Sequence, residues 1–260
     1  MSINRIKALC LRHLYPLRRD LDLLSDMIYW PIIDTILWGV TSQWLFESSG
    51  IPGLVAAILI GLILWNVIWR SQAEVSRNLI DEIWNSNLVN LFSTPLQLRE
   101  WIGGILLLSI VKTGITISLL SLLVVVLYHV NFLTLGLWLV VFIFLSTMSG
   151  WWIGFISASI VIRFGPKMQN VVWTLPGILL PFSAIYFPVD RLPESAQIIS
   201  NLIPTTYVFE AMRSVLSGNY DIAHALGVSL LLNGVYLTLS IWFFVRSFAY
   251  SKTLGLGRFE

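Results

Sequence analysis

Two ionisable residues lie inside long apolar stretches of this sequence. Asp34 falls within residues 27–46 and Lys112 within residues 101–128. A charged side chain is costly in lipid, so each is expected to face protein or water. At about 1.5 Å per helical residue, Asp34 would lie about 10 Å and Lys112 about 16 Å from the same membrane surface. We therefore predict either a structural ion pair, with a snorkelling lysine as a variant, or a polar element on a path through the membrane.

The remaining reactive side chains give no catalytic pattern. His13, His129 and His224 are expected at or near the membrane surfaces, and no pair of them has metal-ligand spacing. The single cysteine, Cys10, excludes an internal disulfide. No Gly-x-x-x-x-Gly-Lys-Ser/Thr motif occurs, and polar segments of about 35 residues leave no room for a nucleotide-binding domain. We predict no enzymatic activity, no catalytic or metal-binding residues and no cofactor held by this chain.

The composition is that of a membrane protein. Of the 260 residues, 57% are hydrophobic and 12% are charged, against about 25% charged in soluble domains, and the mean hydropathy is +0.80. A span needs about 20 mostly apolar residues. Six stretches are predicted to cross the membrane: residues 27–46, 53–69, 101–128, 132–162, 168–187 and 222–245. The fourth is too long for one straight span and should tilt or pass the membrane surface.

Lysine and arginine predict the orientation, because they accumulate in cytoplasmic segments. The side expected to face outward holds Arg191 and Arg213. The other side holds Arg5, Lys7, Arg12, Arg18, Arg19, Arg70, Arg77, Arg99, Arg163, Lys167, Arg246, Lys252 and Arg258. Both termini are therefore predicted to be cytoplasmic, and no cleavable signal peptide is expected.

Three further segments are amphipathic and are not expected to span. Residues 1–26 are predicted to form an interfacial helix bent at Pro16, rather than a disordered basic leader. Residues 70–100 contain a short apolar run that ends at Thr94 and Pro95; it needs a partner surface, or else folds back on the membrane. Residues 188–221 are predicted to form two short helices separated by Pro204, rather than a plain surface loop. The apolar face of the first segment comprises Ile3, Ile6, Cys10, Leu14, Leu17, Leu21 and Leu24.

Small residues recur every four positions in the fourth stretch. They are Ser146, Gly150, Gly154 and Ala158. Such a stripe allows close approach of another helix. It predicts a packing seam, either within one chain or across a dimer.

The order of these segments resembles the permease subunits of type-2 ABC exporters. The resemblance covers nearly the whole chain and is most specific in two stretches. The first is Leu88-Val-Asn-Leu-Phe-Ser-Thr-Pro-Leu96, which is similar to the coupling segment of the family. The second runs from Pro181 through Phe187-Pro188, Leu192-Pro193, Pro204 and Tyr207 to Arg213, and is similar to its outer motif. The family often has glycine where Ala184 stands.

The resemblance implies an all-α membrane protein with one permease domain, residues 1–260. It would have six transmembrane helices, the N-terminal interfacial helix, a cytoplasmic coupling helix and an extracellular re-entrant hairpin. Two such chains, expected to be identical, would form the pathway in the cell membrane. Two separate ABC subunits would bind ATP and Mg, and no nucleic acid is involved. The ATPase contact would comprise Asn85, Leu88, Val89, Leu91, Thr94 and Pro95, and the outer gate Phe187, Pro188, Tyr207, Glu210 and Arg213.

Two other functions remain open. An ion- or proton-coupled secondary transporter would work without an ATPase and would need Asp34 or Lys112. A membrane assembly factor or receptor would show no vectorial transport. The sequence does not identify the cargo.

Overall fold

The computed structural model describes residues 2–256, apart from the side chains of Leu17, Arg18 and Asp22. Leu17 of the expected apolar face, and Arg18 and Arg258 of the expected cytoplasmic charges, lie outside these described parts. The helices are α1 (Ile3–Leu14), α2 (Leu21–Leu24), α3 (Trp30–Ser49), α4 (Leu54–Trp84), α5 (Leu88–Ser93), α6 (Leu98–Tyr128), α7 (Trp138–Phe164), α8 (Val171–Leu179), α9 (Glu194–Ser200), α10 (Pro204–Leu216) and α11 (Ala223–Thr253). Single turns of 3-10 or π helix are η1 (Tyr15–Arg18), η2 (Ser25–Tyr29), η3 (Phe132–Leu135), η4 (Pro166–Met168), η5 (Leu180–Phe182) and η6 (Val189–Arg191).

The chain is an all-helical, multi-pass membrane protein. Four helices in the described residues, α4, α6, α7 and α11, are long and apolar enough to cross a membrane. The expected first span, residues 27–46, overlaps the 20-residue helix α3, which begins at Trp30 and continues to Ser49. The expected fifth span, residues 168–187, contains only the nine-residue helix α8, followed by η5. Nine residues rise about 14 Å, less than half of the apolar core of a bilayer. Helix α3 is not among the four described helices that are long and apolar enough to cross, and α8 is too short. That these two segments cross the membrane stays a prediction.

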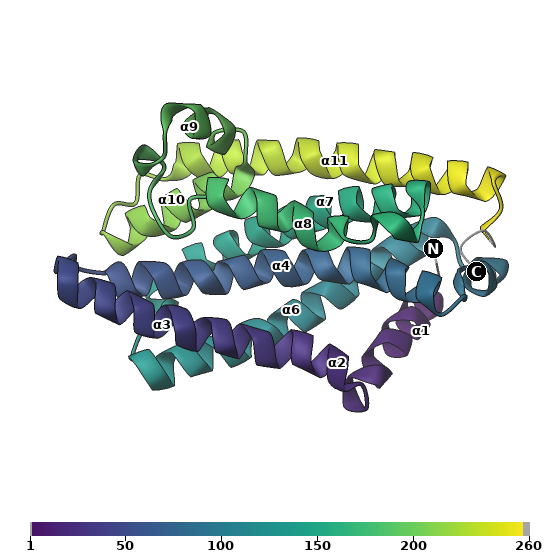
Figure 1. The fold of residues 1–260 in the computed structure, drawn as a ribbon, viewed down its shortest axis with the longest axis horizontal. Coiled ribbons are helices and arrows are strands. Elements are labelled where there is room, and N and C mark those ends of the chain that lie inside the picture. Colours follow the sequence, from purple (N-terminus) through teal and green to yellow (C-terminus); the bar gives the residue numbers. More distant parts are fainter. Residues whose placement is uncertain (1, 257–260) are drawn as a thin grey trace.

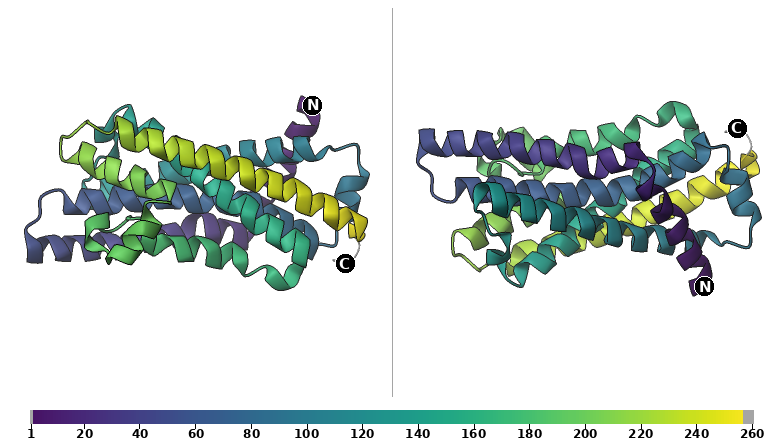
Figure 2. Two further views of the ribbon diagram at one scale, coloured as in Figure 1. Left: turned by 90° about the horizontal axis from the view of Figure 1, so that it is seen from above. Right: turned by 90° about the horizontal axis from the view of Figure 1, so that it is seen from below.

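Helix α4 lies at the centre of the bundle. It packs most extensively against α7 and also contacts α6 and α3, and both views in Figure 2 place it among the other long helices. It continues without a break to Trp84, so the predicted span end at residue 69 is not a helix end. The charged residues after position 69 did not stop the helix because the bundle itself supplies partners for them.

Proline and glycine set several other boundaries. Helix α1 ends at Leu14, and η1 begins beside Pro16, which confirms the expected bend. The long stretch 132–162 is divided into η3 and α7, with Gly136 at a positive φ of 58° between them. Pro204 begins α10 and separates it from α9, as predicted.

The two ends of the bundle carry different elements. Helix α1, the segment with α5 and the C-terminal end of α11 lie at one end, named here the α5 end (Figure 1). Helices α9 and α10 lie at the opposite end, named the α10 end. The orientation of these two ends across the membrane stays a prediction from the basic residues.

Candidate functional site

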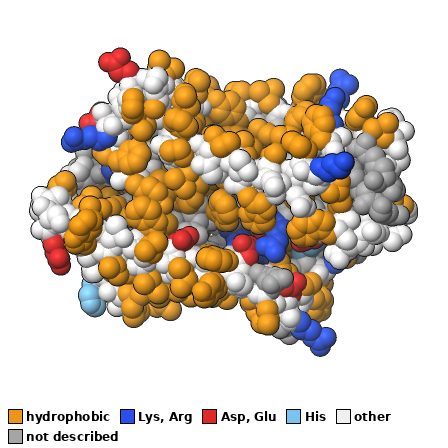
Figure 3. Space-filling model, viewed as in Figure 1, with side chains coloured by type: hydrophobic (Ala, Val, Ile, Leu, Met, Phe, Trp, Pro, Cys, Tyr) orange, Lys and Arg blue, Asp and Glu red, His pale blue; other side chains and the backbone are white. Residues whose placement is uncertain are grey.

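A groove of about 660 Å³ runs between α3, α4 and α8. In the view of Figure 3, the surface around it is largely hydrophobic, with a few charged side chains in the depression. Half of its lining residues are aromatic, and two are carboxylates. The lining residues are Asp26, Trp30, Pro31, Asp34, Trp38, Leu62, Trp65, Asn66, Trp69, Trp173, Leu180 and Tyr186.

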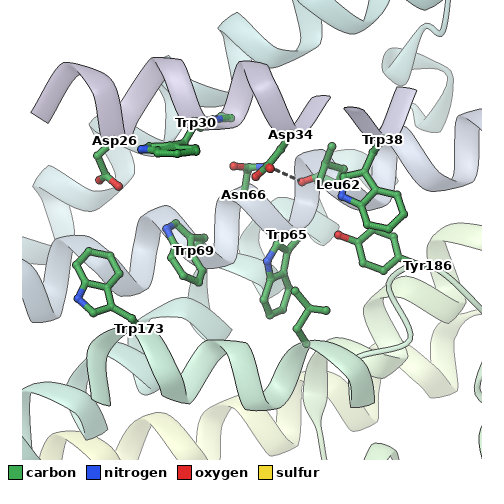
Figure 4. Close-up of a pocket in the computed structure, with 12 residues that line it drawn as sticks. Asp26, Trp30, Asp34, Trp38, Leu62, Trp65, Asn66, Trp69, Trp173 and Tyr186 are labelled. Atoms are coloured by element: carbon green, nitrogen blue, oxygen red, sulfur yellow. Dashed lines mark hydrogen bonds between the residues drawn. The ribbon is translucent and has the colours of Figure 1, made fainter. Parts of the chain in front are cut away.

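Helical spacing places the aromatic side chains on facing walls. Trp30 and Trp38 come from α3, while Trp65 and Trp69 come from α4 (Figure 4). Residues four apart lie on one helix face. The α4 pair is one such step apart and the α3 pair two steps, so each helix turns two tryptophans toward the groove. At one end the Trp38 ring stacks on Tyr186, with centroids 4.1 Å apart and planes at 15°.

Asp34 and Lys112 do not form the expected ion pair. Asp34 is exposed and points from α3 toward the groove and Asn66 of α4 (Figure 4). Lys112 is 3% exposed, and its Nζ lies 2.8 Å from Oε2 of Glu74. Similar depths in the membrane did not predict which side chain pairs with Lys112. Its partner, Glu74, falls within residues 70–100, which the sequence predicts not to span.

A buried charge cluster, comprising Asp26, Arg70, Glu74, Arg77 and Lys112, lies beside the groove. Arg70 Nη1 is 3.0 Å and Arg77 Nη1 is 2.9 Å from Asp26 Oδ2. Arg70 Nη1 is also 3.6 Å from Glu74 Oε1. The cluster joins η2, α4 and α6. Sequence reasoning missed it, although positions 70, 74 and 77 of one helix share a face.

Helix α1 is attached to both sides of α5. Arg12 Nη2 lies 2.7 Å from Oε2 of Glu82, which precedes α5. Arg5 Nη1 lies 3.1 Å from Oε2 of Glu100, which follows α5, and donates to the carbonyl oxygen of Pro95 at 2.6 Å. Both glutamates are at least 97% buried. Two carboxylates that bracket α5 therefore hold the same short helix.

The neighbouring His13 is held in a desolvated position. Burial is the main cause that lowers the pKa of His13 to about 4; the Lys112 and Arg12 cations contribute in the same direction, and Glu74 opposes them. The Nε2 atom is buried without a hydrogen-bond partner among the described residues. Protonation would therefore place a buried positive charge beside two cations, with no hydrogen-bond acceptor at Nε2 among the described residues.

The predicted ATPase-contact residues divide into two groups. Leu88 and Leu91 are 2% and 6% exposed and belong to the apolar core at the α5 end. Asn85, Thr94 and Pro95 are exposed, and Val89 is half-buried. Any partner would therefore meet the second group, while the two leucines attach α5 to its own bundle.

The predicted outer-gate residues form a hydrogen-bonded clamp at the α10 end. Glu210 Oε1 accepts from the backbone N–H of Val189 at 2.9 Å and lies 2.8 Å from Arg213 Nη2. Arg213 Nη1 donates to the carbonyl oxygen of Ala184 at 2.7 Å. The clamp fixes the segment between η5 and η6 onto α10. Three other hydrogen bonds in this region, donated by Thr206, Tyr207 and Tyr236, go to the carbonyl oxygens of Phe182, Asn201 and Leu202.

Two predicted gate residues lie outside this network of contacts, and Ala184 lies within it. Phe187 and Pro188 are exposed. Ala184 is fully buried with φ = +56°. This left-handed conformation favours glycine, which gives a physical reason for the glycine expected from the resemblance.

The small-residue seam packs within the chain. A Cβ atom on Gly150 would lie 2.5 Å from the carbonyl oxygen of Ile68, and one on Gly154 would lie 2.7 Å from that of Gln72. Both contacts are with the backbone of α4. Ser146 and Ala158 are fully buried on the same helix. Of the two alternatives from sequence, the structure supports the seam within one chain.

The family comparison gives a clear result. The family model of ABC-2 type transporters matches residues 20–217, about three-quarters of the chain. The match includes the groove, the charge cluster, α5 and the clamp at the α10 end. No curated protein matches the chain.

Proposed function

The chain belongs to the ABC-2 type transporter family and is an ABC permease, and from this premise we propose that it forms half of the translocation path of an ATP-driven exporter. Two copies would face each other across the membrane, and two separate ATP-binding subunits would dock at the α5 end. The observation that carries this proposal is the aromatic groove, which extends along α3, α4 and α8 and is open on one side. A second copy placed against that side would convert two half-grooves into one path.

The α5 end has the chemistry needed to receive a force from a docked subunit. Leu88 and Leu91 fix α5 to the core, while Asn85, Thr94 and Pro95 remain exposed for a partner. Displacement of the segment around α5 would reach α4 through the hydrogen bond from Asn87 to Glu82. It would reach α6 through Arg5, which binds both the carbonyl oxygen of Pro95 and Glu100. At the α10 end, the Glu210–Arg213 clamp would hold the exit closed.

The test of ATP coupling is copurification. The tagged chain is extracted from its native membrane in mild detergent, and the eluate is assayed for ATP hydrolysis and for a copurifying ATPase. We expect an ATP-binding subunit to elute with the chain. The variants Asn85→Glu and Thr94→Glu should each reduce this recovery, while Ser195→Glu on α9, at the opposite end, should not.

One observation favours a second candidate, an ion-coupled carrier. Asp34 offers an exposed carboxylate within the groove, where it could exchange a proton. That function requires transport by the chain alone in vesicles without ATP. Recovery of such activity from a preparation free of ATPase would overturn the exporter proposal.

A further inference from the structure

We propose that the groove binds an organic cation, with Asp34 as the counter-ion and the surrounding aromatic rings as the walls. The inference rests on the proposed function, because it names the cargo class of the same groove. It commits to a lipophilic molecule with a positive charge, such as a substituted ammonium or phosphonium ion.

The first argument is the state of the two carboxylates in the groove. Asp26 is already bound by Arg70 and Arg77. Among the residues that the structure describes, no lysine, arginine or histidine forms an ion pair with Asp34. Asp34 is therefore the carboxylate that is left for a ligand. A carboxylate within an apolar membrane protein is costly to ionise, and a bound cation would offset that cost.

The second argument is the placement of aromatic rings around Asp34. Trp30 and Trp38 lie four residues before and four residues after Asp34, so all three share one face of α3. Trp65 and Trp69 face them from α4, and Tyr186 stacks on Trp38 (Figure 4). The faces of indole and phenol rings attract cations, and this attraction strengthens when water is excluded. A carboxylate flanked by such rings combines the two interactions that select an organic cation.

The size and charge of the groove narrow the ligand further. Its volume of about 660 Å³ falls within the range of sites for drug-sized molecules. An anionic cargo would be repelled by Asp34. A neutral apolar cargo would gain nothing from the carboxylate, whereas a carbohydrate could stack on the rings. The experiment therefore also measures binding of a neutral analogue and of a carbohydrate.

The experiment measures binding to the purified full chain, with any copurified ATPase, in lipid nanodiscs. Equilibrium dialysis uses tetraphenylphosphonium as the cation and tetraphenylborate as the matched anion. Triphenylphosphine oxide is the neutral analogue, maltohexaose is the carbohydrate probe, and binding to empty nanodiscs is subtracted. The variants are Asp34→Asn, Asp34→Glu, and Glu47→Gln, which removes an exposed carboxylate from the distal end of the same helix. Monodisperse elution confirms that each variant is folded.

We expect the wild-type chain to prefer tetraphenylphosphonium to both analogues. Asp34→Asn should weaken tetraphenylphosphonium binding at least about tenfold, as expected for loss of a close charge pair. Asp34→Glu and Glu47→Gln should each retain the affinity within about threefold.

Three results would overturn the inference. They are unchanged tetraphenylphosphonium affinity in Asp34→Asn, equal binding of the neutral analogue, or binding of maltohexaose without binding of the cation. ATPase recovery is measured on the same preparation. If the ATPase elutes with the chain while the cation fails to bind, the cargo class is wrong and the exporter proposal stands. If the cation binds while no ATPase elutes with the chain, the cargo class stands and the exporter proposal is wrong.

Discussion

Arg12 of α1 donates a hydrogen bond to Oε2 of Glu82 at 2.7 Å, and the same carboxylate oxygen accepts from the side-chain amide of Asn87. Glu82 is buried, whereas the Arg12 side chain is 44% exposed. One carboxylate thus joins the N-terminal helix to the turn that begins α5. Because α5 is the expected docking element for an ATPase, a movement of α5 would reach α1 through this contact.

Removal of the Arg12 guanidinium should weaken the connection between α1 and the turn that begins α5. Arg12→Gln leaves a buried carboxylate with one fewer donor, and we expect a loss of about 1 kcal/mol, small because the arginine is partly solvated. ATP hydrolysis by the assembled complex should become less dependent on cargo. Thermal unfolding and cargo-stimulated ATPase rates check both effects, and Arg99→Gln, an exposed arginine at the α5 end, is the control. Equal behaviour of the two variants would contradict the proposed role.

Lys112 should be a structural residue of the charge cluster. Lys112→Met removes the nearer of the two cations around buried Glu74, at 2.8 Å, and leaves Arg70 at 3.6 Å. Breaking a buried ion pair costs about 3 kcal/mol when no other partner remains, so we expect a loss of stability somewhat below that value. The double variant Lys112→Met/Glu74→Gln should recover much of the lost stability, which a melting curve in detergent measures. If the double variant transports cargo as the wild type does, Lys112 is not part of a proton path. Loss of transport in a stable double variant would favour the ion-coupled carrier.

Ala184→Gly should stabilise the protein. Ala184 adopts φ = +56°, a conformation that costs alanine about 1 kcal/mol relative to glycine. The melting temperature is therefore expected to rise slightly. Ala196→Gly, within helix α9, is the matched control and should lower it, since glycine destabilises a helix interior by about 0.5–1 kcal/mol. A decrease in both variants would contradict the assigned backbone conformation.

Gly150→Ala should destabilise the bundle. The new Cβ would lie 2.5 Å from the backbone oxygen of Ile68 on α4, and forced separation of packed elements costs about 1–3 kcal/mol. Gly234→Ala on α11, where a Cβ meets open space, should be neutral or stabilising by up to about 1 kcal/mol. Thermal melts of the two variants compare the same chemical change at a seam and at a free surface. Similar melting temperatures would rule out the close α4–α7 approach.

Stability should fall in mild acid because of His13. Burial lowers the pKa of His13 from 6.5 to about 4, so the unfolded chain binds more protons between these values. By linkage, the free energy of unfolding decreases as pH falls from about 6.5 toward 4. Melting curves across this window should be less pH-dependent in His13→Gln than in the wild type. The groups facing His13 include Arg12, Lys112 and Glu74, so a parallel pH dependence in the variant would assign the effect to another group.

Local sequence determined the apolar helices, many of their ends and the family. Pro16 and Pro204 marked real helix boundaries because proline cannot donate a backbone hydrogen bond and restricts the preceding residue. The period-four stripe at Gly150 and Gly154 marked a true packing face, since helical periodicity is a property of the chain itself.

Tertiary structure alone decided which groups meet. Lys112 pairs with Glu74 instead of Asp34 because α4 continues past residue 69, and only the packed bundle supplies the cations that make that continuation stable. The orientation of Leu88 and Leu91 toward the core was likewise open, since an apolar helix face fits a partner or its own bundle equally well. Sequence periodicity identifies a face of a helix, but the helix that covers this face depends on the distant contacts of the folded chain.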